Sequence, residues 1–228
     1  MVVGVFSRSM GDRREFLLER NRALAAFTLI ELLVVVAIIA ILVVLVSVVG
    51  PAALERGRET ASLNNMRQIG VGFQLYANEN SMQLPNRVIT GDRWPKLLQA
   101  YLQDVKVYAD PSDATNFLRK KTDPLSNTRN NTSYFMNGFN DIGAFNDDTV
   151  SVRLNSLDSP SQTILLAPTR GHAHFYMDFD EGNQNDILKK NSFNGGSNYV
   201  FADGSARFIK EKDYEDSLWY VRKTQPAN

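Results

Sequence analysis

The longest apolar run in the chain lies close to its amino end and extends from Phe27 to Val49. Within this run, only Thr28, Glu31 and Ser47 are not apolar. A helix of this length rises roughly 35 Å, which is enough to cross the hydrocarbon core of a bilayer. Because the run is apolar on every face, it predicts a membrane-spanning helix and not the core helix of a soluble protein.

After Gly50 and Pro51 the pattern becomes amphipathic, with apolar residues three or four positions apart. These apolar positions are Leu63, Met66, Ile69, Gly70, Phe73 and Tyr76. We expect Pro51 to bend or loosen the helix locally, because proline lacks a backbone N–H and its ring clashes with the preceding turn. Polar residues at 78–81 and Pro85 should end a helix of about 50 residues, whose apolar stripe must pack on another element.

Beyond Pro85, short apolar segments alternate with turn-forming residues. Strands are expected at 163–166, 175–179, 199–202 and 206–210, the last two forming a hairpin across Asp203-Gly204. A short helix is expected at 94–102, whereas the polar stretches 112–132 and 140–152 are expected to be loops. The predicted fold class is α+β, with a long N-terminal helix packed on a small antiparallel β-sheet.

The charge distribution indicates the orientation of the chain in a membrane. The 25 Lys and Arg residues balance 25 Asp and Glu residues, and no basic cluster suggests a nucleic-acid partner. Five arginines and three acidic residues precede the apolar run, whereas the charges at 55–59 balance. The positive-inside rule therefore places the N-terminus in the cytoplasm. Because the chain has no cysteine, the exported part must be stable without disulfides.

A plain membrane anchor does not explain Glu31, because an ionised carboxylate is costly in hydrocarbon unless it reaches an interface, takes up a proton or meets a cation. Cleavage between Ala26 and Phe27 would create an α-amino group about one helical turn from this carboxylate, or opposite the Glu31 of a neighbouring copy. An ordinary signal anchor and a secretory signal peptide remain alternatives. The latter has a shorter apolar region followed by a small-residue cleavage site, which 47–51 matches poorly.

The sequence Phe27-Thr28-Leu29-Ile30-Glu31, followed by apolar residues, resembles the prepilin signature of type IV pilins and type II secretion pseudopilins. The resemblance implies a pilin-like fold, removal of the leader after Ala26 by a prepilin peptidase, and N-methylation of Phe27. It also implies that Glu31 guides assembly by pairing with the N-terminus of another subunit. The family usually has Gly before the cut. Since Ala26 is also small, we expect cleavage, with slower processing.

This resemblance divides the chain into a leader at 1–26, a transmembrane and assembly helix at 27–49, the amphipathic half of the helix at 50–80 and an exported globular domain at 81–228. It implies a single-pass inner-membrane protein whose globular domain lies in the periplasm or on a surface filament. The implied partners are prepilin peptidase, other pilin-like subunits and the inner-membrane assembly machinery. We therefore expect a structural subunit of a pilus or pseudopilus and not an enzyme. The alternative is a membrane-anchored ligand-binding module that does not polymerise and uses the two long loops.

A second resemblance concerns the C-terminal part. The stretch 197–205, which contains Asp203 and Gly204, resembles the motif of a large prepilin-like group in which a His stands ten residues before an Asp-Gly pair. The stretches 66–70, 110–113 and 133–137 match the same group. Here Phe193 stands in place of the His, so the resemblance does not carry a role of that His to this chain. Relatives often carry cysteines where this chain has Ser62 and Asp110, so a disulfide between such cysteines is absent.

Asp203 has a structural and a functional interpretation. A hairpin favours Asp-Gly because glycine tolerates positive φ and the aspartate side chain caps the turn. Alternatively, Asp203 could bind calcium together with Asp178 and Asp180, since the resemblance implies calcium near this end of the sheet and carboxylates are its preferred ligands. The structural interpretation is the stronger one, because acidic loops are more often simply solvated.

Other sites have weaker support in the sequence. His172 and His174 would share one face of an extended segment, but no third metal ligand lies nearby in the sequence. The sequence contains no nucleophile elbow, phosphate-binding glycine loop or zinc-protease helix. We therefore expect no catalytic residues and no cofactor beyond the candidate calcium ion.

Overall fold

The computed structural model describes residues 27–87, 91–113, 132–139, 152–170, 175–177 and 187–221. The chain forms two compact units, Met1–Val48 and Val49–Asn228, which we describe separately. We call the second unit the head.

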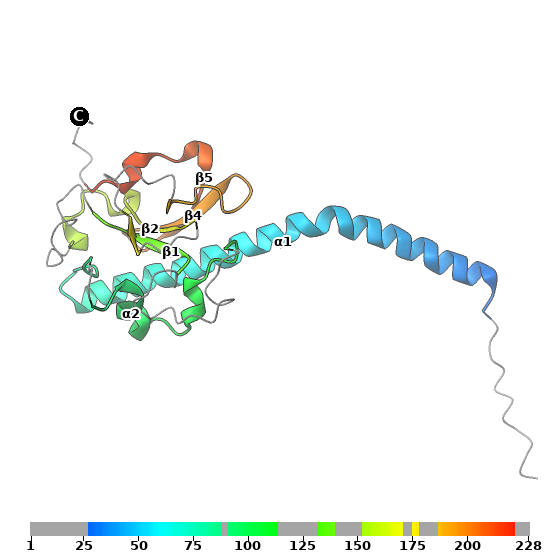
Figure 1. Cartoon of the computed structure of the whole chain (residues 1–228), viewed down its shortest axis with the longest axis horizontal. Coiled ribbons are helices and arrows are strands. Elements are labelled where there is room, and N and C mark those ends of the chain that lie inside the picture. The colour runs from blue at the N-terminus through cyan, green and yellow to red at the C-terminus, as the bar shows by residue number, and fades with distance from the viewer. Residues whose placement is uncertain are drawn as a thin grey trace, which may run out of the picture. The chain divides into compact units, whose positions relative to one another are not determined.

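The longest element is helix α1, Leu29–Glu79, whose 51 residues confirm the predicted length (Figure 1). Its segment Leu29–Ser47 has a mean hydropathy of 3.5 and is long and apolar enough to cross a membrane. The helix continues through Pro51, although proline cannot donate to the carbonyl of Ser47. The hydroxyl of Ser47 donates to the carbonyl of Val43, at 2.7 Å, so this polar side chain is satisfied within the helix.

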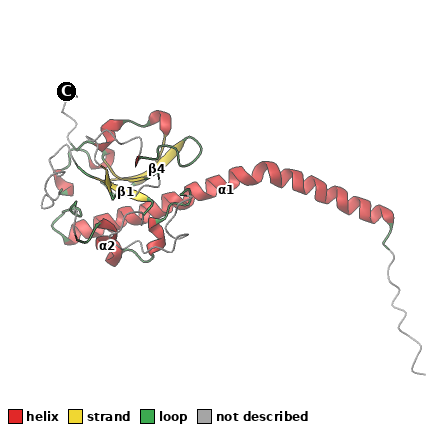
Figure 2. Cartoon of the chain, in the orientation of Figure 1, coloured by secondary structure: helices red, strands yellow, loops and turns green. Residues whose placement is uncertain are grey.

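The described part of the head contains a five-stranded sheet in the order β3-β1-β2-β4-β5. Figure 2 shows the strands in yellow. The strands are β1 Tyr134–Asn137, β2 Ile164–Pro168, β3 Tyr176–Met177, β4 Gly196–Phe201 and β5 Ala206–Lys210. Four strands pair antiparallel as expected, with β4 and β5 joined by the predicted hairpin. The predicted α+β fold with a small antiparallel sheet is confirmed, and the short strand β3 adds to the edge of β1 in parallel.

Most predicted elements recur with shifted ends. The four expected strands correspond to β2, β3, β4 and β5, although only 175–177 of the segment expected at 175–179 is described. The helix expected at 94–102 is present as α2, Trp94–Leu97, followed by a 3-10 turn at Leu98–Tyr101. The remaining described 3-10 turns are Val105–Tyr108, Leu154–Ser156, Pro160–Gln162, Glu211–Asp213 and Asp216–Trp219.

The apolar stripe of α1 packs on one face of the sheet, as predicted. Met66, Ile69 and Phe73 are fully buried there, together with Trp94 and Val200. Each such side chain contributes about 1.5–3 kcal/mol when it is removed from water. This face is therefore the main hydrophobic core of the head.

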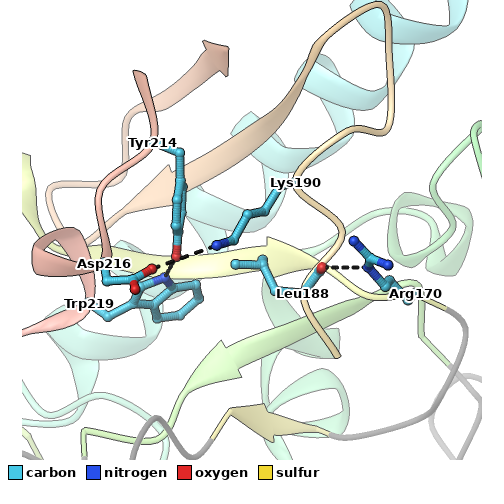
Figure 3. Close-up of polar contacts among 6 residues, drawn as sticks. All are labelled: Arg170, Leu188, Lys190, Tyr214, Asp216 and Trp219. Carbon is cyan, nitrogen blue, oxygen red and sulfur yellow. Dashed lines mark hydrogen bonds and ion pairs between the residues drawn. The ribbon is translucent and has the colours of Figure 1, made fainter. Parts of the chain in front are cut away.

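The opposite face of the sheet has a smaller core that the C-terminal segment covers. The ring of Trp219 stacks on Phe135 with centroids 5.6 Å apart, and its indole N–H donates to the hydroxyl of Tyr214. Lys190 places its ammonium 4.5 Å from the centre of the Tyr214 ring and 3.8 Å from the Asp216 carboxylate (Figure 3). These contacts fasten residues 211–221 to the sheet.

Arg170 lies two residues after the end of β2. Its Nε donates to the carbonyl of Leu188 at 2.9 Å (Figure 3). Leu188 is fully buried in the same smaller core. The bond therefore holds the end of β2 against the segment that leads into β4.

Candidate functional site

The amino end of α1 is closed by a reciprocal pair of side chains, Thr28 and Glu31. The Glu31 Oε2 atom accepts hydrogen bonds from the backbone N–H of Thr28, at 2.9 Å, and from its hydroxyl, at 2.7 Å. The backbone N–H of Glu31 in turn lies 3.3 Å from the Thr28 hydroxyl oxygen. This arrangement is a capping box, which a Thr and a Glu three residues later form at a helix start.

The carboxylate of Glu31 can accept further hydrogen bonds. Both bonds from Thr28 end on the single oxygen Oε2. An ionised carboxylate offers about four lone-pair sites, and a carboxylate near a helix N-terminus is also favoured by the helix dipole. A further donor, such as an amine, can therefore bind Glu31 while Thr28 keeps the side chain in place.

The helix that follows this cap exposes an apolar surface. No other described part of the chain buries the candidate membrane-spanning segment Leu29–Ser47. Soluble monomers rarely expose contiguous apolar surface on this scale. The segment thus fits a single membrane anchor.

Asp203 and Gly204 form the turn of the β4–β5 hairpin. The Asp203 Oδ1 atom accepts hydrogen bonds from the backbone N–H and the hydroxyl of Ser205, at 2.9 and 2.6 Å. Gly204 has φ of +83°, a conformation that side chains other than glycine rarely adopt. The carboxylate therefore has a structural role in the turn, as the hairpin interpretation predicts.

Helix α1 lies against the backbone of the same turn. A Cβ atom on Gly70 would lie only 2.5 Å from the carbonyl oxygen of Gly204. The side-chain amide of Gln74, one helical turn later, donates to the carbonyl of Ala202 at 2.8 Å. The backbone of the turn, at Ala202 and Gly204, therefore docks the long helix.

Several predicted site residues lie outside the described part of the chain. These are Ala26, Asp178, Asp180, His172 and His174, together with most of the loops at 112–132 and 140–152. Among the residues that the structure does describe, no three His, Cys, Asp or Glu side chains gather to hold a metal. Calcium binding by Asp178, Asp180 and Asp203 stays a prediction.

Phe193 lies at the position where the resembling group has its histidine. Its ring is buried, and its backbone exchanges two hydrogen bonds with Gly196, at 2.9 and 2.7 Å. A buried phenyl ring neither titrates nor binds an ion, so it contributes packing at this position.

The structure also shows polar residues whose roles the sequence did not reveal. Ser62 and Asp110 are buried, and the Ser62 hydroxyl donates to Asp110 Oδ2 at 2.7 Å. Their contact spans 48 positions of sequence, so no local pattern indicates it, and only the cysteines that the resemblance places at both positions in relatives point to this pair. Thr28, by contrast, could have been singled out from its spacing of three residues to Glu31.

Comparison with known proteins identifies the N-terminal segment. The family model of the prokaryotic N-terminal methylation motif matches residues 22–47. No curated protein and no solved structure matches the chain significantly. The match includes Phe27, Thr28 and Glu31 and ends where the membrane-length segment ends.

Proposed function

We propose that this chain, whose residues 22–47 match the prokaryotic N-terminal methylation motif, is a prepilin-like protein and a structural subunit of a filament, either a type IV pilus or a type II secretion pseudopilus. The observation that carries the proposal is Glu31, a carboxylate held at the start of an apolar, unburied helix within the motif. The subunit has no catalytic role.

Processing creates a cation that can pair with Glu31. Prepilin peptidase removes the leader after Ala26 on the cytoplasmic side and methylates the new amino group of Phe27. That amine pairs with the Glu31 carboxylate of a neighbouring subunit, while the Thr28 hydrogen bonds keep the carboxylate oriented. The pair fixes the axial stagger between neighbouring helices, because a charge pair in a low-dielectric setting is costly to separate.

Assembly also gives the apolar part of α1 a new environment. Before assembly the segment Leu29–Ser47 spans the inner membrane, with the N-terminus in the cytoplasm and the head outside. In the filament these helices bundle with those of other subunits, and the sheets of the heads form the outer coat. Packing between helices and the Glu31 pair drive this transfer, since lipid tails are as apolar as the helix itself.

Fractionation of cells tests the proposal directly. The chain is co-expressed with a prepilin peptidase and filament-assembly machinery, and surface or periplasmic filaments are sheared off and sedimented. We expect the processed chain in the sedimented fraction, and the full-length chain in the membrane when the peptidase is omitted. Processed chain that stays in the membrane as monomers would contradict the proposal and favour an anchored binding module.

A further inference from the structure

Helix α1 has a second row of residues, on the side that faces away from the sheet. From Leu54 to Leu75 its members follow one another at alternating spacings of three and four positions. With about 3.6 residues per turn, this row lies on the opposite side of the helix from Met66, Ile69 and Phe73, which pack on the sheet. All of its members are exposed. We call this set the outer row; it comprises Leu54, Gly57, Ala61, Asn64, Gln68, Val71 and Leu75.

The two ends of the outer row carry large apolar side chains that the head leaves uncovered. Leu54, Val71 and Leu75 are 58%, 54% and 43% exposed. A single exposed leucine is ordinary on a protein surface. Here, however, the exposed apolar residues occupy positions of one heptad pattern, by which the seam of a coiled coil meets a second helix. The outer row therefore has the form of a helix-binding seam.

Small residues follow Leu54 in the outer row. Gly57 and Ala61 are four positions apart, a spacing at which small residues let two helix backbones approach closely. A Cβ atom on Gly57 would meet nothing within 4 Å. The space beside this turn of α1 is therefore open for a second helix.

The middle of the outer row is polar. Arg67 Nη1 donates to Asn64 Oδ1, and Gln68 Nε2 donates to the backbone carbonyl of Asn64, each at 3.4 Å. A carboxamide has two N–H donors and an oxygen with two lone pairs, so both side chains keep capacity for further bonds. The same side chains in a second copy supply the matching donors and acceptors. Polar residues at such a place in a seam fix the register of two helices.

The membrane anchor determines how two copies of the row meet. Every copy carries the segment Leu29–Ser47, which is apolar enough to cross a membrane. Identical copies that are anchored in one membrane in the same orientation present their outer rows in the same direction. A symmetric contact between two copies uses the same surface on both. In a parallel pair each residue of the row therefore lies opposite itself.

The residues that flank the outer row are compatible with this parallel pair. In a parallel coiled coil, a residue beside the seam meets the residue five positions later in the other copy. None of these flanking pairs brings two like charges together. The pairs are Ala53 with Arg58, Thr60 with Asn65, Arg67 with Gly72, and Gln74 with Glu79.

We propose that the outer row is the contact surface of a parallel homodimer, which forms in the membrane before filament assembly. Leu54, Val71 and Leu75 bury their apolar side chains against the same residues of the second copy. Asn64 and Gln68 pair across the seam and set its register. The second copy is the occupant because the row is complementary to itself in spacing, in polar groups and in flanking charge.

The dimer rests on the membrane anchorage that the proposed function includes, but it does not depend on filaments. Pairing of Glu31 with the amino group of Phe27 in another copy displaces the two helices along their axes by about 6 Å, because the residues are four positions apart. The dimer instead brings identical residues to one level. The two contacts are therefore different arrangements and can be measured separately.

Single cysteines test the dimer, because the chain has none of its own to give a background signal. Val71→Cys and Leu75→Cys are expressed in cells that lack filament-assembly machinery, and isolated membranes are oxidised with copper phenanthroline. A disulfide requires two Cα atoms about 4.4–6.8 Å apart, which identical residues reach only where they face each other. Non-reducing gel electrophoresis measures the cross-linked dimer.

Arg67→Cys is the matched control, since Arg67 is exposed on the same stretch of α1 but lies outside the outer row. We expect at least about fivefold more dimer from Val71→Cys and Leu75→Cys than from Arg67→Cys. Equal yields from all three variants would overturn the proposal, because random collision would explain them. Dimers that form at 71 and 75 only in the presence of assembly machinery would also overturn it and place the row inside the filament.

A second substitution tests whether apolar contact holds the pair together. In the Val71→Cys chain, Leu75→Lys should lower the yield of dimer roughly tenfold, whereas Leu75→Ile should preserve it. Leu75 is exposed in the single copy, so neither change should alter the fold of the head, which circular dichroism checks. An undiminished yield with lysine would overturn the proposal. Failure of the dimer leaves membrane fractionation and filament sedimentation of the unaltered chain unchanged, so it is distinguishable from failure of the proposed function.

Discussion

Replacing Glu31 by alanine is expected to abolish incorporation of the chain into filaments. The fold of the head and the removal of the leader should be unaffected. The substitution removes the carboxylate that pairs with the neighbouring amino terminus, so subunits lose the interaction that sets their register. The head lies in a separate compact unit and should fold as before. The measurement is the amount of processed chain in the sheared, sedimented fraction relative to the membrane fraction.

Two variants separate the charge of Glu31 from its capping role. Glu31→Gln keeps an acceptor for the Thr28 N–H but loses the charge, and it should also fail to assemble. Ser47→Ala removes another polar group from the same helix, one that bonds only to its own backbone at Val43, and it should assemble normally. Normal filaments from Glu31→Ala would contradict the pairing.

Substituting Gly70 by alanine is expected to lower the free energy of unfolding of the head by about 2 kcal/mol. The new Cβ would lie 2.5 Å from the carbonyl oxygen of Gly204, which belongs to the backbone and cannot rotate away. The hairpin turn must therefore shift, and with it the bond from Gln74 to Ala202. Urea unfolding of the full chain in detergent, followed by tryptophan fluorescence, measures the loss.

Gly57 provides the control on the same helix. A Cβ there would meet nothing within 4 Å. Gly57→Ala should leave stability unchanged or raise it by up to about 1 kcal/mol, because alanine favours the helix over glycine. Equal stability of the Gly70→Ala and Gly57→Ala variants would mean that the close contact at Gly204 does not constrain the fold.

The elements with a clear period could be predicted from the sequence. The apolar run and the stripe that includes Met66 and Phe73 predicted α1 within two residues of its observed ends. The Asp-Gly pair predicted the β4–β5 hairpin, since local turn chemistry decides it. Strand β1 was not predicted because its apolar run, Tyr134 to Met136, is only three residues long and lies between polar residues.

Contacts between distant segments could not be predicted in the same way. The parallel pairing of β3 with β1 depends on how the chain between them folds. The hydrogen bond between Ser62 and Asp110, and the nearby hydroxyl of Tyr134, join three segments that carry no shared local signal. For the candidate site, Glu31 was evident as a charge in an apolar run, and the spacing of three residues between Thr28 and Glu31 could also have indicated their capping box.

The mass of the N-terminal peptide tests the central claim most directly, because every later step depends on processing. The chain is expressed with and without a prepilin peptidase, and its N-terminal peptide is measured in both cases. The account predicts a terminus at Phe27 carrying one added methyl group when the peptidase is present, and an intact leader when it is absent. An intact leader under both conditions would contradict the account and leave a protein held in the membrane by an uncleaved signal anchor.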